Sequence, residues 1–229
     1  MNAQYGMILD VDGLIGDTEP INAKVTIRLL EEMYGLKDVR YEDFAAGYGR
    51  GAEAYIRAGA RVHGLELTDE QVHAVAEIRE RRLAETIRKE GLPAFPGVLD
   101  LIHAGLRDGR FRLSIATSAT RELSEAILTA VKVPYERMAY VSGSDVKKKK
   151  PDPQIFLIAI ERLGVPANRC VVFEDAPSGV QAAKAAGARC IAVTNTVPAG
   201  ELEDADLIVD SLERVGLDTI RNLVNSGER

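Results

Sequence analysis

The sequence predicts an α/β fold, in which a doubly wound, parallel-sheet (Rossmann-like) core carries an inserted α-helical cap domain. Short apolar segments alternate with helical segments after residue 97, and a similar apolar segment, Met7-Ile8-Leu9, stands near the start of the chain. Short apolar strands that alternate with helices indicate a parallel sheet covered on both faces. No strand-like alternation occurs between Asp17 and Leu92. That stretch is therefore predicted to be a helical insertion directly after the first strand.

Three helices are predicted in the insertion. The first has Asp17 or Thr18 at its cap and Pro20 in its first turn, where proline is tolerated. The last opens with Thr68-Asp69-Glu70-Gln71, a capping-box pattern. A glycine follows each helix, as expected at a helix end. The predicted helices run from the cap at 17 or 18 to residue 35, over 52–62 and over 68–89.

The second part of the core begins after a stiff linker at 93–97, which contains two prolines and a glycine. Strands are predicted at 112–117, 139–142, 170–174, 189–193 and 207–209, and helices at 98–106, 120–131, 153–163 and 178–186. We therefore assign residues 1–15 and 94–229 to the core and 16–93 to the cap. Glycine or proline occurs at both crossings between them, so we expect the cap to move as a lid.

Composition and charge narrow the class of protein. The 229 residues carry a net charge of −6, with 46% hydrophobic and 28% charged residues, as in a globular protein with a full core. The negative balance argues against binding to nucleic acid or to an anionic membrane. Cys170 and Cys190 lack metal or redox spacing, and no signal segment or membrane helix is visible. We expect a cytoplasmic protein with no obligatory protein partner.

Chemically active side chains stand at or just past the ends of four predicted strands. They are Asp10 and Asp12, Thr117, Lys150, and the pair Glu174 and Asp175. The carboxyl edge of an open parallel sheet is where ligands bind. Carboxylate oxygens suit Mg²⁺, whereas a hydroxyl and an ammonium bind phosphate oxygens. The set is therefore suited to hold Mg²⁺ and a phosphoryl group together.

The strings that carry these residues resemble, in order, the four motifs of the haloacid dehalogenase superfamily. The first is MILDVDGLIGDTE at residues 7–19, and the resemblance extends to about residue 188. The string EDAPSGV at 174–180 and the helical insertion resemble the branch with a helical cap. That branch contains sugar-phosphate phosphatases, phosphoglycolate phosphatases and beta-phosphoglucomutase.

The resemblance implies a role for each residue. Asp10 would be the nucleophile that forms an aspartyl-phosphate, and Asp12 would be the general acid and then the general base. Thr117, Ser118 and Lys150 would bind the transferring phosphoryl group. The Mg²⁺ ligands would be Asp10, the backbone carbonyl of Asp12, Asp175 and, directly or through water, Glu174.

One cation of the cap is a candidate for substrate choice. Arg50 lies in the glycine-rich loop Gly47-Tyr48-Gly49-Arg50-Gly51, and in this branch the corresponding loop faces the active site. Its guanidinium would bind a second anionic group of the substrate. The alternative is a surface arginine in a flexible turn. The run 147–149, three lysines, is expected to be a solvated loop.

The leading hypothesis is a Mg²⁺-dependent phosphatase, a phosphoric monoester hydrolase, that acts on a small phosphorylated metabolite such as a sugar phosphate. A phosphosugar mutase on the same residues is the alternative. Arg50 favours the mutase, and Asn22 disfavours it because the mutase resembled here has histidine at that position. A non-catalytic phosphate-binding module is disfavoured because Asp10, Asp12 and Lys150 are all present. Substrate identity and oligomeric state are left open.

Overall fold

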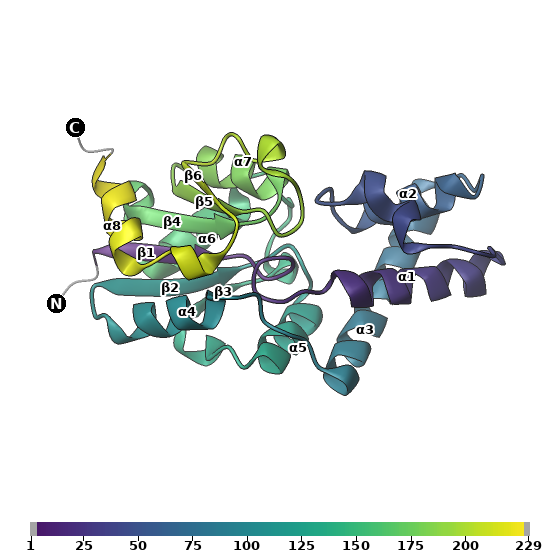
Figure 1. Cartoon of the computed structure of the whole chain (residues 1–229), viewed down its shortest axis with the longest axis horizontal. Helices are drawn as coiled ribbons and strands as arrows, with labels where there is room; N and C mark the ends of the chain where they lie inside the picture. The colour runs from purple at the N-terminus through teal and green to yellow at the C-terminus, as the bar shows by residue number, and fades with distance from the viewer. Residues whose placement is uncertain (1–3, 227–229) are drawn as a thin grey trace.

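A six-stranded sheet forms the centre of the molecule (Figure 1). The computed structural model describes residues 4–226 of the chain. The strands lie in the order β3-β2-β1-β4-β5-β6, and every neighbouring pair is parallel. This doubly wound order reverses between β1 and β4, which confirms the predicted fold class. The strands are β1 (Tyr5–Leu9), β2 (Phe111–Ala116), β3 (Ala139–Val141), β4 (Cys170–Glu174), β5 (Arg189–Val193) and β6 (Leu207–Val209).

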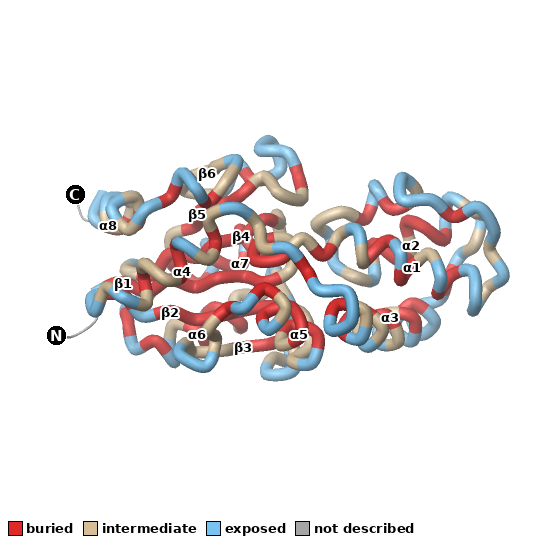
Figure 2. The backbone as a smooth tube through the Cα atoms, turned by 60° about the horizontal axis from the view of Figure 1, so that its bottom comes forward, coloured by how far each residue is buried: buried red, intermediate tan, exposed pale blue. Residues whose placement is uncertain are grey.

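Helices cover both faces of the sheet because successive residues of a strand point to opposite sides. Met7 and Leu9 pack with residues of α4, α5 and α8, whereas Ile8 packs with residues of α6 and α7. Figure 2 shows the buried strands between these helices. The helices are α4 (Val98–Arg107), α5 (Arg121–Val131), α6 (Gln154–Leu163), α7 (Pro177–Ala185) and α8 (Leu217–Asn225).

A helical lobe lies beyond the carboxyl edge of the sheet (Figures 1 and 2). Thr68 caps its last helix as predicted, since its hydroxyl accepts a hydrogen bond from the backbone N–H of Gln71. The exact limits of a core and a cap domain, at 15/16 and 93/94, stay a prediction. The helical lobe comprises α1 (Glu19–Tyr34), the 3₁₀ helix η1 (Tyr41–Gly47), α2 (Ala52–Val62) and α3 (Asp69–Glu90).

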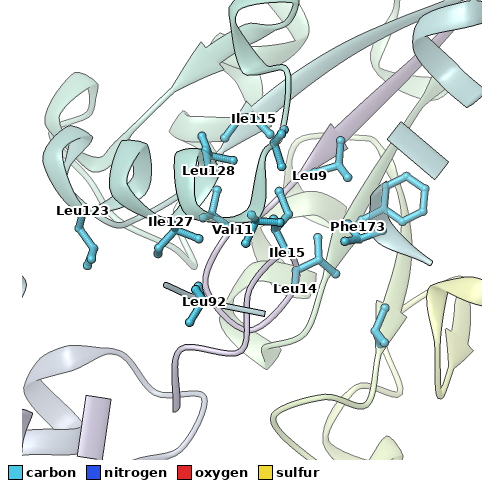
Figure 3. Packing of buried hydrophobic residues seen from close by; sticks show 14 of the residues in the cluster. Leu9, Val11, Leu14, Ile15, Leu92, Ile115, Leu123, Ile127, Leu128 and Phe173 are labelled. Atoms are coloured by element: carbon cyan, nitrogen blue, oxygen red, sulfur yellow. The ribbon is translucent and has the colours of Figure 1, made fainter. Parts of the chain in front are cut away.

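Two chain crossings, near 13–17 and 91–96, join the helical lobe to the rest of the molecule and lie side by side. The backbone N–H of Phe95 donates to the Ile15 carbonyl at 3.0 Å, which ties one crossing to the other. Leu92 and Ile15 belong to one buried apolar cluster that also contains side chains of α5 (Figure 3). The pivot of the expected lid is therefore a packed, hydrogen-bonded pair of segments, and its movement stays a prediction.

Sequence and structure differ mostly in short elements. The periodicity did not predict η1 or α8, and β2 is shifted by one residue from the expected 112–117, which puts Thr117 just past the strand. Cys170 and Cys190 are both buried and free. Over residues 4–226, no helix combines the length and apolar character needed to span a lipid bilayer.

Candidate active site

Lys150 holds two carboxylates together at the carboxyl edge of the sheet. Its Nζ donates to Asp10 Oδ1 at 2.7 Å and to Glu174 Oε1 at 2.6 Å. Asp10 follows β1 and Glu174 ends β4, the two strands between which the sheet reverses. The Lys150 side chain is 7% exposed, and its Nζ lies 4.8 Å from the centre of the Phe156 ring. The topology thus brings together three of the residues predicted from sequence.

Burial and charge set the protonation of this cluster. Burial raises the pKa of Asp10 to about 7, although the Lys150 ammonium acts to lower it. Burial also raises the pKa of Asp175 well above its ordinary value, and the charges of Glu174 and Asp10 add to this effect. Burial alone would lower the pKa of Lys150, but its two carboxylate partners more than offset this and raise it. A single ammonium therefore neutralises the cluster incompletely.

The same carboxylates form a set that fits a divalent cation. Asp10, Glu174 and Asp175 are buried, and each offers an oxygen atom within 4.8 Å of the others. Oxygen-only donors suit a hard ion such as Mg²⁺. Glycine at position 179 leaves room for the Glu174 carboxylate, because the Cβ of any other residue there would lie 1.8 Å from Glu174 Oε1. The Asp12 carboxylate is not in this set, so any contribution from Asp12 would come from its backbone carbonyl.

Glu174 also orders the turn into α7. Its Oε2 accepts hydrogen bonds from the backbone N–H groups of Asp175 at 3.0 Å and Ala176 at 3.1 Å. Asp175 does not cap this helix, which begins at Pro177 without a side-chain cap. Its carboxylate instead accepts a hydrogen bond from the Thr196 hydroxyl. The two adjacent carboxylates therefore have separate surroundings.

Asp12 is held by the start of the helical lobe. Thr18 stands at the cap position of α1, but its side chain does not cap the helix. Its hydroxyl donates to Asp12 Oδ1 instead, and Asn22 Nδ2 donates to Thr18 Oγ1 at 3.3 Å. Burial raises the pKa of Asp12, while the Arg79 charge acts to lower it. A carboxyl with a raised pKa is suited to deliver a proton.

Arg79 of α3 is a buried cation that the sequence analysis missed. The residue is 6% exposed, its Nε donates to Thr26 Oγ1 at 2.9 Å, and its guanidinium carbon lies 5.3 Å from the centre of the Tyr55 ring. Within residues 4–226, no carboxylate forms an ion pair with it. Burial lowers the pKa of Arg79, and the charges of Asp12 and Glu19 act in the opposite direction without direct contact. Because no carboxylate of the described residues touches the guanidinium, the site is suited to an anionic ligand.

One signal in the sequence could have identified Arg79. The string EIRERR at 77–82 reads as a solvated, charged helix face. However, Arg79 stands four residues after Val75 and four before Leu83, both of which are buried. Residues at this spacing share one face of a helix, so Arg79 lies on the buried face of α3.

The other predicted residues form no side-chain hydrogen bond or ion pair with Asp10, Lys150 or Glu174 within residues 4–226. Thr117 is 1% exposed, and its hydroxyl accepts a hydrogen bond from the backbone N–H of Ala119 at 3.2 Å. Ser118 is half-buried and Arg50 is exposed; neither side chain forms a hydrogen bond or ion pair with the residues the structure describes. The lysines at 147–149 are exposed, as expected for a solvated loop. The substrate-binding roles of Ser118 and Arg50 stay predictions.

Residues 7–193, which include Asp10, Lys150 and Glu174, match the family model described as haloacid dehalogenase-like hydrolase. The chain belongs to this family. This hydrolase is 32% identical over 185 residues to fructose-1-phosphate phosphatase YqaB of Escherichia coli, covering 80% of this chain and 92% of that protein. It is 33% identical over 217 residues, 93% of its own length, to Protein SUPPRESSOR OF QUENCHING 1, chloroplastic, of Arabidopsis thaliana, and spans only 20% of that protein.

A solved structure supports the same assignment. The crystal structure of a CbbY variant from Rhodobacter sphaeroides, in complex with xylulose-1,5-bisphosphate, superposes on this hydrolase with a TM-score of 0.78 at 26% identity. The match covers 95% of this chain and 99% of that one. The superposition therefore includes the helical lobe as well as the sheet.

Proposed function

We propose that this hydrolase is a Mg²⁺-dependent phosphatase that acts on a small phosphorylated metabolite, such as a sugar phosphate, through a phosphorylated aspartate. The observation that carries the proposal is the Lys150 ammonium between the Asp10 and Glu174 carboxylates at the point where the sheet order reverses. A phosphatase among the relatives supports the enzyme class. Phosphoric monoester hydrolase is also the class that the sequence predicts.

Asp10, Glu174 and Asp175 would hold the Mg²⁺ ion, together with the backbone carbonyl of Asp12. When bound, the ion supplies positive charge that lets a carboxylate approach an anionic phosphate. Lys150 contributes a further positive charge, holds one oxygen of Asp10 in place and binds a phosphoryl oxygen together with Thr117 and Ser118. These contacts align phosphorus with the Asp10 carboxylate.

The reaction has two steps in this scheme. Asp10 attacks phosphorus, a bond forms between its carboxylate oxygen and phosphorus, and the bond from phosphorus to the substrate oxygen breaks. Asp12 gives its proton to that leaving oxygen. Water then attacks phosphorus while Asp12 accepts a proton from it, and the bond from phosphorus to Asp10 breaks to release inorganic phosphate.

The helical lobe contributes cations that favour an anionic or hydroxyl-rich substrate. Arg79 is buried near Asp12 and lacks a carboxylate partner within residues 4–226, so a substrate oxygen would give its guanidinium the partner that it lacks. Arg50 is exposed beside the contact between the helical lobe and the core, and would bind a second anionic group. We assign the distal part of the substrate to these arginines.

The test is phosphate release from a panel of phosphorylated metabolites with Mg²⁺, including both anomers of glucose 1-phosphate. We expect release from sugar phosphates, its loss with EDTA and its return with Mg²⁺. Conversion of one anomer to glucose 6-phosphate without net phosphate release would identify the mutase instead. Full activity in metal-free buffer would contradict the proposed metal site.

Asp10→Asn tests the nucleophile. An amide cannot form the acyl-phosphate, so turnover is expected to vanish while the thermal unfolding transition persists. Asp204→Asn is the matched control, because Asp204 is an exposed aspartate of the core whose carboxylate forms no ion pair within residues 4–226. Mass spectrometry of the wild-type protein during turnover should find phosphate on Asp10. Phosphate on another residue would refute the assignment.

A further inference from the structure

The segment that follows β5, residues 194–197, lies beside the proposed metal site and has no role in the scheme above. The backbone N–H of Thr194 donates to the Val209 carbonyl at 3.0 Å, which ties the start of the segment to β6. Val197, at its end, is 6% exposed. The segment is thus anchored at both ends, so its two middle residues present their side chains from a fixed backbone.

These middle residues contact two parts of the site. Asn195 Nδ2 donates to the Gly13 carbonyl at 2.9 Å, and the Thr196 hydroxyl donates to Asp175 Oδ2. Within residues 4–226, this is the one hydrogen bond that the Asp175 carboxylate makes. A Cβ at Gly13 would lie 2.0 Å from Asp175 Oδ2 and 2.7 Å from Thr196 Oγ1. Gly13, Asp175 and Thr196 are therefore closely packed, and the Thr196 hydroxyl fixes how the carboxylate is turned.

The helical lobe rests on the same segment. Gly49 lies in the loop between η1 and α2, the loop that carries Arg50. A Cβ at Gly49 would lie 2.9 Å from Val197 Cγ1 and 4.0 Å from Thr196 Cγ2. Thr196 therefore has two separable faces: its hydroxyl is directed to Asp175, and its methyl group faces Gly49 of the lobe.

We propose that Thr196 is a positioning residue whose hydroxyl orients Asp175 for the metal and whose methyl group helps to seat the helical lobe. The inference rests on the proposed function, because it takes Asp175 as a metal ligand. Partners that hydrogen-bond to a ligating carboxylate fix its orientation, and their loss commonly weakens metal affinity by about 10- to 100-fold. The lobe and the metal site would then be linked through one side chain.

Two substitutions separate the two faces. Thr196→Val removes the hydroxyl at nearly constant volume, whereas Thr196→Ser keeps the hydroxyl and removes the methyl group. Titration calorimetry with MgCl₂ alone should show that Thr196→Val weakens Mg²⁺ binding by about tenfold or more, while Thr196→Ser binds like the wild type. Kinetics at saturating Mg²⁺ should show a lower kcat/KM for Thr196→Ser than for the wild type, because this variant lacks the methyl group that helps to seat the lobe.

Thr194→Val is the matched control, because its hydroxyl makes no hydrogen bond with the described part of the chain. Its Mg²⁺ affinity should equal that of the wild type. If Thr196→Val does not fold, Thr196→Ala is compared with Thr196→Ser, because both lack the methyl group and they differ only in the hydroxyl. Each variant's thermal transition separates loss of stability from loss of metal binding.

Wild-type Mg²⁺ affinity in Thr196→Val would overturn the positioning role. Equal losses of affinity in the Val and Ser variants would also overturn it, because the side chain would then act by packing alone. A wild-type protein that binds no Mg²⁺ would instead refute the proposed metal site. The failure of this inference and the failure of the proposed function therefore give different results.

Discussion

Asp10 must be ionised to act as a nucleophile or metal ligand, yet burial raises its pKa to about 7. The contact with Lys150 at 2.7 Å is not enough to keep the carboxyl fully charged at neutral pH. Protons and a divalent cation therefore compete for the same oxygen atoms. In the proposed scheme, the chemistry of Asp10 would depend on the metal ion as much as on the fold.

This competition predicts how metal binding depends on pH. A raised carboxyl pKa means that Asp10 is mostly protonated below about pH 7, so Mg²⁺ affinity should rise by about tenfold from pH 6 to pH 8. Calorimetry over this range measures the affinity. Repeating it in buffers of different ionisation enthalpy measures the protons released. An affinity independent of pH would show that Asp10 is already ionised in the free protein.

Gly179 predicts an effect on stability at the residue scale. Alanine in place of an interior helical glycine usually stabilises a helix by about 0.5–1 kcal/mol. At Gly179 of α7 the new Cβ would lie 1.8 Å from Glu174 Oε1. Gly179→Ala should therefore lower the free energy of unfolding by about 1–3 kcal/mol, measured by urea denaturation. Gly200→Ala, whose Cβ would meet nothing within 4 Å, should show no such loss.

Sequence patterns identified Asp10 and Glu174 because each stands at the end of a predicted strand, and parallel strands bring such ends to one edge. Lys150 lies eight residues past the predicted strand 139–142 and was identified with the help of the family motif that its surroundings resemble. Sequence patterns did not identify Arg79 or Thr196. The roles of these two residues depend on which side chains they meet in the folded chain, Thr26 and Tyr55 for Arg79 and Asp175 for Thr196. A local pattern carries no such information.

At the scale of elements, the loop between η1 and α2 contains two glycines in the left-handed region. Gly49 has φ 67° and Gly51 has φ 86°. An L-residue is strained at both positions, and more at Gly51, whose ψ of 167° places it in a region that is essentially restricted to glycine. Their surroundings differ, because a Cβ at Gly49 would meet Val197 whereas one at Gly51 would meet nothing within 4 Å. Comparing substitutions at the two glycines therefore distinguishes the effect of backbone strain from the effect of contact between the lobe and the core.

Gly49→Ala should lower kcat/KM for a sugar phosphate more than Gly51→Ala does, because only the first substitution pushes the loop away from the core. Steady-state kinetics and a thermal unfolding measurement on both variants test this. Equal losses would mean that loop conformation, and not the contact with Val197, controls activity.

Elements with strong end signals were predicted best. The bounds of α2 and β4 match the sequence prediction, and α3 differs by one residue at each end, since Gly91 and the Thr68 capping box mark its limits. Helix η1 and α8 were missed. They are short, with 7 and 9 residues, so few apolar residues establish a period. The contacts that each makes with the rest of the fold decide its structure.

At the scale of the whole molecule, the protein carries a net charge of −6, so an anionic substrate must be attracted by local cations. Lys150 is the candidate cation in the core, while Arg79 and Arg50 are the candidate cations in the helical lobe. We expect the core to provide the chemistry and the lobe to choose among substrates, because Asp10, Lys150 and Glu174 belong to the core.

Arg50→Ala tests this division. It should raise KM, or lower kcat/KM, for a substrate with a second anionic group, and barely affect p-nitrophenyl phosphate, whose hydrolysis needs only the core site. Arg61→Ala is the control, because Arg61 is an exposed arginine of α2 that pairs with Glu66 at 3.3 Å. Losses of equal size on both substrates would show that Arg50 supports the structure of the lobe and does not select substrates.

The paired crossings also make the helical lobe an exchangeable module. Gly16 and Ala94 face each other in an antiparallel bridge, so the chain leaves the sheet and returns to it at nearly the same point. No strand of the sheet comes from the residues between them. Closing a longer loop between fixed ends costs little, about 0.6 kcal/mol per doubling of length. Recombination that replaces the insertion with one of another size would therefore leave the proposed phosphoryl-transfer residues in register, so that selectivity would change while the proposed reaction is retained.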